Sequence, residues 1–302
     1  MRFAIMIEGQ QGVTWDDWLS LARDCERLGF ETVFRSDHYS NDFGAPFLGS
    51  LDAWGTICAL AAVTDRLRLG TLVSPVTFRH PSNLAKLVVT ADHVSGGRIE
   101  LGIGTGWMEL EHRAYGFPFP PLRERMDRLA EQLEVIAGSF GPGPFSFAGE
   151  YYAVEGLDAQ PKPVQQPFPI VMGGAAAPRG AALAARFAAE YNVVFATPED
   201  ARAARERLVR ACEDRGRDPG TLHFSLMHGL LLGRDEAELE RRAAQLPPGA
   251  RKTFVAGTPE QVVARLREYE AAGVERVMLQ HLLVRDRDVL ELLAAEVVPA
   301  FA

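Results

Sequence analysis

Residues 3–34, FAIMIEGQQGVTWDDWLSLARDCERLGFETVF, contain two short apolar runs on either side of a segment with helical periodicity. The runs Phe3–Ile7 and Thr32–Phe34 have the length and composition of buried strands. Between them, Trp15–Leu28 follows Thr14, whose hydroxyl can cap a helix, and precedes a glycine that suits a helix end. This stretch predicts one strand–helix–strand unit.

The same alternation continues through the rest of the chain. Further strand-like runs are Leu67–Val73, Ile99–Ile103, Ile170–Met172, Val193–Phe195, Phe224–Leu226 and Val277–Leu279. Helix-period segments such as Leu51–Val63, Ser82–Val94 and Leu122–Ala137 lie between them. Eight strands alternating with helices in 302 residues predict an α/β protein with a parallel sheet covered on both faces. The count favours a closed (β/α)₈ TIM barrel, although an open doubly wound sheet gives a similar pattern.

Two longer segments interrupt the alternation. Met108–Pro121 follows the fourth strand, so in a barrel it is an insertion on the C-terminal face, where loops shape substrate pockets. Gly138–Pro169 contains Phe145–Tyr152, which predicts a hairpin with a glycine turn. No repeat, low-complexity tract or flexible linker is present, so we expect residues 1–302 to form a single domain.

Composition excludes several functions. The net charge is −8 without a basic stripe, which argues against nucleic-acid binding. The chain contains no run of about 18 apolar residues, so we expect no membrane span. The apolar stretch at the N-terminus is too short for a signal peptide, so we expect a cytoplasmic protein. The three cysteines and seven histidines lack metal-ligand spacing, so we expect no metal site. No P-loop or nucleophile elbow is present.

A polar run, Arg35-Ser36-Asp37-His38-Tyr39, follows the second strand. In a barrel it lies on the catalytic face. His38 can donate a hydrogen bond or a proton near neutral pH, and Asp37 can orient either this histidine or a cofactor. A loop-capping aspartate beside a surface histidine explains the sequence equally well.

Glycine-rich turns follow two other strands. Gly102-Ile103-Gly104-Thr105-Gly106-Trp107 allows close backbone approach to a ring, but Trp107 replaces the third glycine of the dinucleotide fingerprint. A tight turn is the alternative interpretation. Gly173-Gly174-Ala175-Ala176-Ala177-Pro178-Arg179 precedes a helical run, so its amides can bind a phosphate, although a plain turn fits as well. Thr71–Pro81, with two prolines, predicts a rigid wall.

Together, these segments resemble the bacterial luciferase-like superfamily, whose members are barrels that use FMN or the deazaflavin coenzyme F-420. The matching stretches are Ser36–His38, Arg68–Val73, Phe78–Pro81, Ser95–Trp107, Glu109, Glu111, Tyr115-Gly116, Gly173-Gly174, Gly257–Glu260 and Ala272–Val274. The likeness covers nearly the whole chain in the expected order.

The resemblance implies roles for individual residues. His38, with Asp37, is the catalytic candidate beside the cofactor ring. A cis peptide bond between non-proline residues is expected within Leu72–Ser74, behind that ring. The residues assigned to cofactor binding are Asp37, Val73, Ser74, Gly104, Thr105, Gly106, Trp107, Gly173, Gly174, Ala176 and Ala177.

Two departures from the family pattern affect the functional interpretation. Sugar-phosphate dehydrogenases of the family carry a glutamate where this chain has Trp107, which argues against that substrate. Many relatives have a hydroxyl residue after the paired glycines, whereas Ala175–Ala177 offers backbone amides alone.

Three functional hypotheses remain. The first is a coenzyme F-420-dependent oxidoreductase that transfers hydride to or from a small organic substrate. The second is an FMN-dependent monooxygenase, and the third is a flavin-binding barrel without turnover. The resemblance also implies a homodimer formed through helices near the second and third strands. Aromatic residues suggest an apolar pocket but also suit an ordinary core: Trp107, Tyr115, Phe117 and Phe119.

Overall fold

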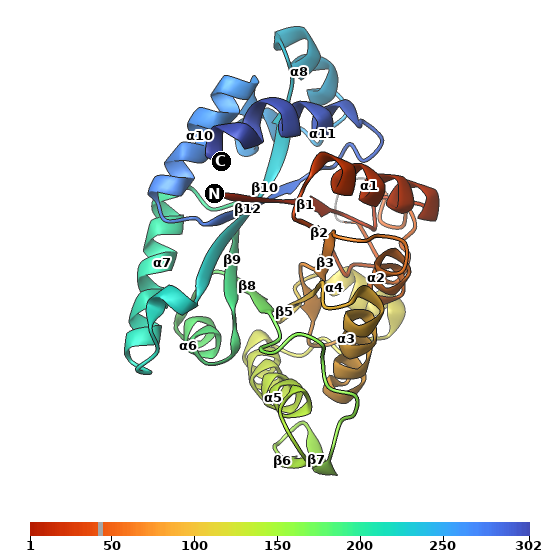
Figure 1. Ribbon diagram of the computed structural model, residues 1–302, viewed down its shortest axis with the longest axis vertical. Coiled ribbons are helices and arrows are strands. Elements are labelled where there is room, and N and C mark those ends of the chain that lie inside the picture. Colours follow the sequence, from red (N-terminus) through yellow and green to blue (C-terminus); the bar gives the residue numbers. More distant parts are fainter. Residues whose placement is uncertain (42–44) are drawn as a thin grey trace.

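The computed structural model describes residues 1–41 and 45–302, in which eight parallel strands form a closed ring (Figure 1). The strands of the ring are β1 (Arg2–Ile7), β2 (Thr32–Arg35), β3 (Arg68–Thr71), β5 (Ile99–Gly104), β8 (Ile170–Gly173), β9 (Glu190–Val194), β10 (His223–Leu232) and β12 (Arg276–Gln280). Each strand pairs with the next, and β10 pairs with β12, which in turn pairs with β1 and closes the ring. The predicted (β/α)₈ barrel is confirmed.

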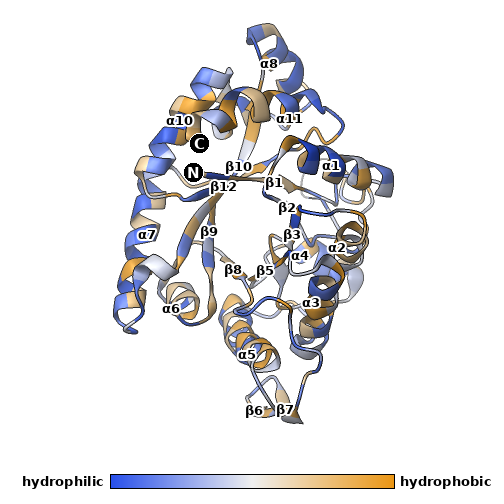
Figure 2. Ribbon diagram, in the orientation of Figure 1, coloured by the Kyte–Doolittle hydropathy of each residue, from blue (hydrophilic) through white to orange (hydrophobic). Residues whose placement is uncertain are grey.

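Helices surround this ring (Figure 1). They are α1 (Trp15–Leu28), α2 (Ala53–Ala61), α3 (Pro81–Ser95), α4 (Glu109–Tyr115), α5 (Leu122–Phe140), α6 (Pro178–Phe187), α7 (Pro198–Glu213), α8 (Glu236–Ala243), α9 (Ala250–Thr253), α10 (Pro259–Ala271) and α11 (Asp288–Leu292). Short 3₁₀ turns span Pro219–Thr221 and Val298–Phe301, and a π-helical turn spans Leu293–Val297. Apolar and polar residues alternate along the outer helices, as amphipathic helices require (Figure 2). None of the described helices combines the length and the apolar character needed to cross a membrane.

The first unit follows its sequence signals closely. Helix α1 has the predicted bounds, and the Thr14 hydroxyl accepts a hydrogen bond from the Asp17 amide at 3.2 Å. Gly29 ends the helix with φ 82°, a left-handed conformation that glycine adopts without steric cost. Strand β9 begins at Glu190, three residues before the predicted strand Val193–Phe195. The prediction began too late because Glu190 and Asn192 are polar and interrupt the apolar pattern.

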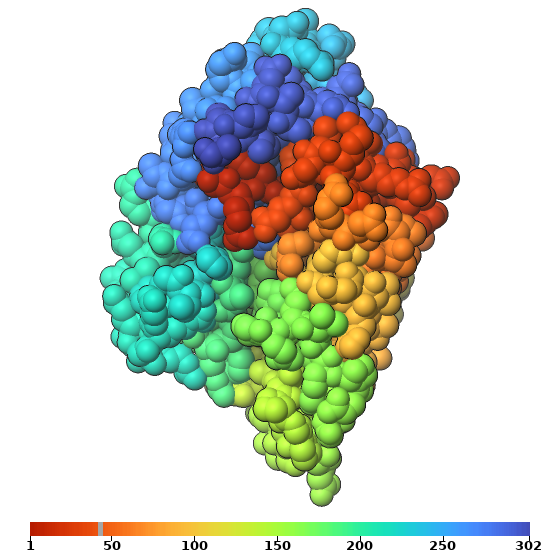
Figure 3. All heavy atoms as spheres, viewed as in Figure 1, coloured from red at the N-terminus to blue at the C-terminus, as the bar shows by residue number. Residues whose placement is uncertain are grey.

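Short strands extend the barrel pattern. Strand β4 (Ser74–Pro75) pairs with β5, and β11 (Val255–Gly257) pairs with β10. The predicted hairpin is confirmed as β6 (Phe145–Ala148) and β7 (Ala153–Leu157). It lies in the connection from α5 to β8 and forms the tapered end of the molecule (Figure 3).

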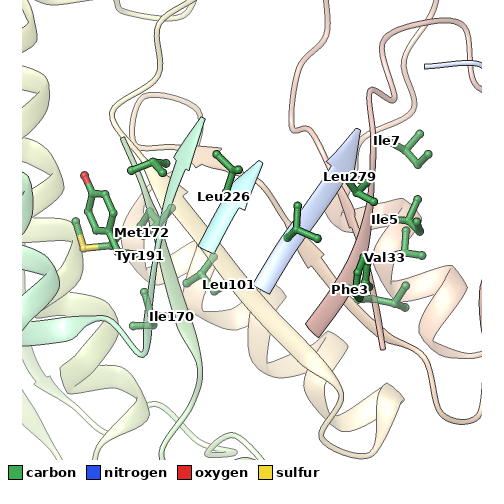
Figure 4. Close-up of a cluster of buried hydrophobic side chains, with 14 of the residues drawn as sticks. Phe3, Ile5, Ile7, Val33, Leu101, Ile170, Met172, Tyr191, Leu226 and Leu279 are labelled. Carbon is green, nitrogen blue, oxygen red and sulfur yellow. The ribbon is translucent and has the colours of Figure 1, made fainter. Parts of the chain in front are cut away.

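The barrel strands are buried on both faces. Phe3, Ile5 and Ile7 of β1 belong to the core between the strands and the helices (Figure 4). Ala4 and Met6 alternate with them and pack inside the ring. This arrangement explains why β1 is a continuous apolar run.

Paired charges occupy the amino-terminal end of the barrel. Arg276 Nη2 lies 2.7 Å from Glu100 Oε2 and 2.8 Å from Glu190 Oε2, and all three side chains are buried. A cavity of about 210 Å³ lies beside them, lined largely by charged residues that form ion pairs with one another. The opposite, carboxyl end of the barrel carries the polar loops that the sequence singled out.

Two buried histidines, His228 and His281, should make the stability of the fold depend on pH. Burial lowers the pKa of His228 and of His281 to about 4. Since an unfolded histidine has a pKa of about 6.5, the unfolded chain binds protons first, and stability present above pH 6.5 is lost as the pH falls toward 4. We expect the free energy of unfolding to fall by about 1 kcal/mol per histidine between about pH 7.5 and 5.5.

Urea unfolding at both pH values measures this loss. His228→Phe removes one titrating group among aromatic neighbours, Phe195 and Tyr269, and should reduce the loss by about half. An undiminished pH dependence in this variant would contradict the assignment.

Candidate functional site

His38 lies just beyond β2, and a buried carboxylate holds it in place. Its Nδ1 donates a hydrogen bond to Glu111 Oε1 at 2.8 Å, and Glu111 Oε2 accepts a hydrogen bond from the Tyr39 amide at 2.9 Å. Burial of the imidazole lowers its pKa, but the hydrogen bond and the charge of Glu111 outweigh burial, so the pKa of His38 is raised. Within the described residues Nε2 has no hydrogen-bond partner, which leaves it free for a ligand.

Asp37 belongs to a different network from His38. Its carboxylate accepts hydrogen bonds from Ser74 Oγ at 2.8 Å and from Arg79, whose Nη2 lies 3.1 Å from Oδ1. Arg79 also contacts Asp52 at 2.7 Å. Burial lowers the pKa of Arg79, but the two carboxylates outweigh burial and raise it. In the described part of the chain, Glu111 therefore orients His38, and Asp37 ties the loop after β2 to the loop after β4.

The wall predicted at the end of the third strand is present. A cis peptide bond joins Leu72 and Val73, within the expected segment. The Val73 side chain packs across two glycines: a Cβ on Gly104 would lie 2.7 Å from its Cγ2, and one on Gly173 3.0 Å from its Cγ1. Ser74 Oγ accepts a hydrogen bond from Trp54 Nε1 at 3.0 Å and is itself buried.

The glycine turn after β5 serves packing and chain reversal. A Cβ on Gly102 would lie 1.8 Å from the Thr71 carbonyl oxygen, so only glycine allows this close pairing of strands. Gly106 has φ 75°, in the left-handed region. This turn leaves Thr105 partly exposed and Trp107 60% exposed, with the indole edge against the His38 ring at 5.4 Å between centroids.

The loop between β8 and α6 contains amides of two kinds. Gly174 donates to the Asn192 carbonyl at 3.1 Å, and Ala176 donates to the Tyr191 hydroxyl at 2.9 Å, so both amides are used inside the protein. Within the described residues, the amides of Ala175 and Ala177 have no such partner. Together with the first turn of α6, they leave donors available to an anion.

Arg125, in the first turn of α5, is a buried cation that the sequence did not single out. Its Nη1 donates to the Gly106 carbonyl at 2.8 Å, and its guanidinium lies 3.9 Å from the Phe119 ring centroid. Nε has no hydrogen-bond partner, and none of the described carboxylates pairs with this side chain, which is only 8% exposed. Burial lowers the pKa of Arg125. An unpaired buried charge is costly, which points to an anionic ligand.

Helix α5, which carries Arg125, packs against α6, which follows the β8–α6 loop. Asp127 of α5 accepts a hydrogen bond from Arg179, in the first turn of α6, at 2.5 Å. Both helices therefore begin side by side at the carboxyl end of the barrel. Among the described residues, no His, Cys, Asp and Glu side chains are grouped as metal ligands.

Comparison with known proteins identifies the family. The model of the luciferase-like monooxygenase family matches residues 1–252. The chain belongs to this family. It is 28% identical to the F-420-dependent glucose-6-phosphate dehydrogenase of Intrasporangium calvum, covering 84% of this chain and 85% of that one. It is 30% identical to the FMNH(2)-dependent dimethylsulfone monooxygenase of Pseudomonas putida, over 60% of this chain and 50% of that one.

The fold of this luciferase-like chain also matches solved structures. The coenzyme F-420-dependent tetrahydromethanopterin reductase of Methanopyrus kandleri superimposes with a TM-score of 0.83 at 21% identity, covering 100% of this chain and 99% of that one. Alignments with the first curated relatives span between 50% and 59% of their length.

The aromatic residues of this luciferase-like chain divide into two groups. Phe117 packs at a tilt against Phe78 with ring centroids 4.7 Å apart, and Phe119 lies 4.6 Å from the His112 ring, so both belong to a packed cluster. Trp107 and Tyr115 are exposed, and Tyr115 stacks against the edge of this cluster, with its ring centroid 6.1 Å from that of Phe117. The aromatic pocket suggested by the sequence is therefore largely packed side chains.

Proposed function

We propose that this luciferase-like protein is an oxidoreductase that binds coenzyme F-420 at the carboxyl end of the barrel and acts on a small organic substrate. The observation that carries the proposal is Arg125, a buried guanidinium that pairs with no described carboxylate and lies on α5, the helix that packs against α6. Guanidinium groups and helix N-termini both suit a phosphate. The Intrasporangium calvum dehydrogenase, which aligns over most of both chains, supports F-420.

Different residues at the carboxyl end of the barrel would bind the phosphate and the ring of the cofactor. Arg125 and the amides of Ala175 and Ala177 would bind the phosphate, while Gly173, Gly174 and Ala176 shape the loop. Contacts to the ring remain proposed for the residues Asp37, Val73, Ser74, Gly104, Thr105, Gly106 and Trp107. Bound there, the cofactor would supply hydride transfer.

His38 is the proposed catalytic residue. Its Nδ1 is hydrogen-bonded to Glu111, so Nε2 is the ring nitrogen that remains for a ligand. The raised pKa shifts the imidazole toward its protonated form, which suits a hydrogen-bond or proton donor. Toward His38, Asp37 would act indirectly, by holding the loop after β2 through Arg79 and Ser74, in addition to its proposed contact with the ring.

An FMN-dependent monooxygenase is the second candidate. The Pseudomonas putida relative supports it, and the same anion site would bind the FMN phosphate. A flavin-binding barrel without turnover is the third. These candidates differ in cofactor preference and in their need for oxygen rather than in the arrangement of His38 and Arg125.

A fluorescence titration of the purified protein with coenzyme F-420 and, separately, with FMN tests the proposal. Tighter binding of F-420 supports the deazaflavin oxidoreductase and directs screening toward hydride donors and acceptors. Tighter binding of FMN supports the monooxygenase, which oxygen-uptake assays would then examine. Binding of neither cofactor refutes the assignment of the site.

We also propose a homodimer, as the family resemblance implies. Val63, just after α2, and Val94, in α3, are exposed apolar residues near the helices expected to pair. Light scattering of the purified protein measures the mass directly, and a monomer refutes this proposal.

A further inference from the structure

Glu8 is a buried carboxylate that the site described so far does not use. It follows β1 at the carboxyl end of the barrel and is 8% exposed. Its Oε1 accepts a hydrogen bond from Gln280 Nε2 at 2.6 Å, and its Oε2 accepts one from Gln10 Nε2 at 2.8 Å. Gln10 in turn accepts a hydrogen bond from Ser36 Oγ at 2.6 Å. This network positions Glu8 firmly between β12 and β2.

Both partners of Glu8 are neutral amides. No Lys, Arg or His of the described residues forms an ion pair with this carboxylate. At the other end of the barrel, by contrast, the buried Glu100 is paired with Arg276 at 2.7 Å. A buried carboxylate without a cation is costly to maintain. Each carboxylate oxygen of Glu8 also retains a lone pair for a further donor.

The position of Glu8 places it beside the proposed catalytic group. Strands β1 and β2 are hydrogen-bonded neighbours, and Glu8 and His38 follow their carboxyl ends. The charge of Glu8 is one of those that act on His38. The mouth therefore contains a carboxyl group that forms no ion pair with any described cation, close to His38.

Across the ring, β9 contributes an apolar surface. Asn192 points inward, since its amide donates to Ser225 Oγ at 2.9 Å, whereas Val193 belongs to the outer core. By the two-residue period of a strand, Val194 points inward again, at the mouth, and it is 49% exposed. Trp107, which packs against the His38 ring, is a second exposed apolar side chain at this end of the barrel.

We propose that Glu8 binds a hydrogen-bond donor of the substrate and selects molecules that carry an amine or hydroxyl group on an apolar body. This inference rests on the proposed function, which places the substrate at the mouth. A cationic amine gains both a charge-assisted hydrogen bond and attraction to the carboxylate. An anionic substrate gains no such attraction at Glu8, and the nearby Arg79 is already paired with two carboxylates.

Three probes with one apolar body test this selectivity: cyclohexylamine, cyclohexanol and cyclohexanecarboxylate. Ligand-detected NMR measures their binding at neutral pH without cofactor, both to the full chain and to Arg125→Met, in which the carboxylate cannot bind the unpaired guanidinium. We expect the amine to bind tightest, the alcohol more weakly and the carboxylate weakest. Glu8→Gln should weaken amine binding roughly tenfold or more and remove the difference between amine and carboxylate.

Two further variants test whether weaker amine binding in Glu8→Gln results from the lost charge rather than from a disturbed structure. Glu8→Asp keeps the charge and should preserve the order of the three probes, with weaker amine binding. Glu296→Gln removes an exposed carboxylate far along the chain and should leave all three affinities unchanged. Thermal melting confirms that each variant is folded.

The outcomes separate this inference from the proposed function. Equal binding of amine and carboxylate, undiminished amine preference in Glu8→Gln, or no amine binding overturns the role of Glu8. The cofactor titration is independent, because the probes are measured without cofactor. Normal F-420 binding with unselective probes refutes the inference alone, whereas binding of neither F-420 nor FMN refutes the proposed function.

Discussion

Replacement of Arg125 by methionine is expected to weaken cofactor binding roughly 100-fold. The guanidinium is buried, pairs with no described carboxylate and donates its one protein hydrogen bond to the Gly106 carbonyl. A bound phosphate would supply the missing counter-charge. Loss of the guanidinium therefore removes charge-assisted hydrogen bonds to that phosphate in a partly dry site. The measurement is the dissociation constant of F-420 or FMN, whichever the unmodified protein prefers, by fluorescence titration.

Stability separates a binding role of Arg125 from a structural one. Methionine fills similar volume and removes a buried, unpaired charge, so the free energy of unfolding without cofactor should be unchanged or higher. A structural arginine would instead lower it. Arg123→Met, at an exposed position of the same helix, is the matched control and should change neither quantity. Unaltered cofactor affinity in Arg125→Met would remove Arg125 from the site.

Periodicity was sufficient to predict a parallel sheet of strands alternating with helices, because each barrel strand is buried on both faces. Runs such as Phe3–Ile7 combine residues of the outer core with residues inside the ring, so they remain apolar throughout. The prediction was least accurate where buried positions are polar. Strand β9 begins with Glu190, which pairs with Arg276 across the barrel, and no local pattern indicates such a contact.

The place of the candidate residues in the fold was predictable for a similar reason. Polar residues after a buried strand must lie at the mouth of a barrel, which placed His38 and the glycine loops correctly at the carboxyl end. The partners were not predictable from the residues alone. Glu111 reaches His38 from a helix 73 residues away, and Arg125 looks like an ordinary residue of an amphipathic helix. Their significance lies in burial and missing counter-charges, which only the folded chain reveals.

Glu111→Gln is expected to lower the pKa of His38 and to reduce turnover roughly 100-fold or more at neutral pH. The Glu111 carboxylate raises the pKa of His38 against the opposing effect of burial. The amide keeps the size of the side chain but removes the charge, so burial dominates and the imidazole releases its proton at lower pH. NMR titration of the His38 ring protons, assigned with His38→Gln, measures the pKa without requiring a substrate.

The direction of the pH effect distinguishes a proton donor from a positioning group. If protonated His38 is the active form, activity is lost as the pH rises through its pKa, and in Glu111→Gln this loss should occur at lower pH. Glu109→Gln, at an exposed position of the same helix, should leave the profile unchanged. A variant with lowered His38 pKa but an unshifted activity profile would show that the ring only positions the substrate. A pKa of His38 that does not fall in Glu111→Gln would refute the role of Glu111 in raising it.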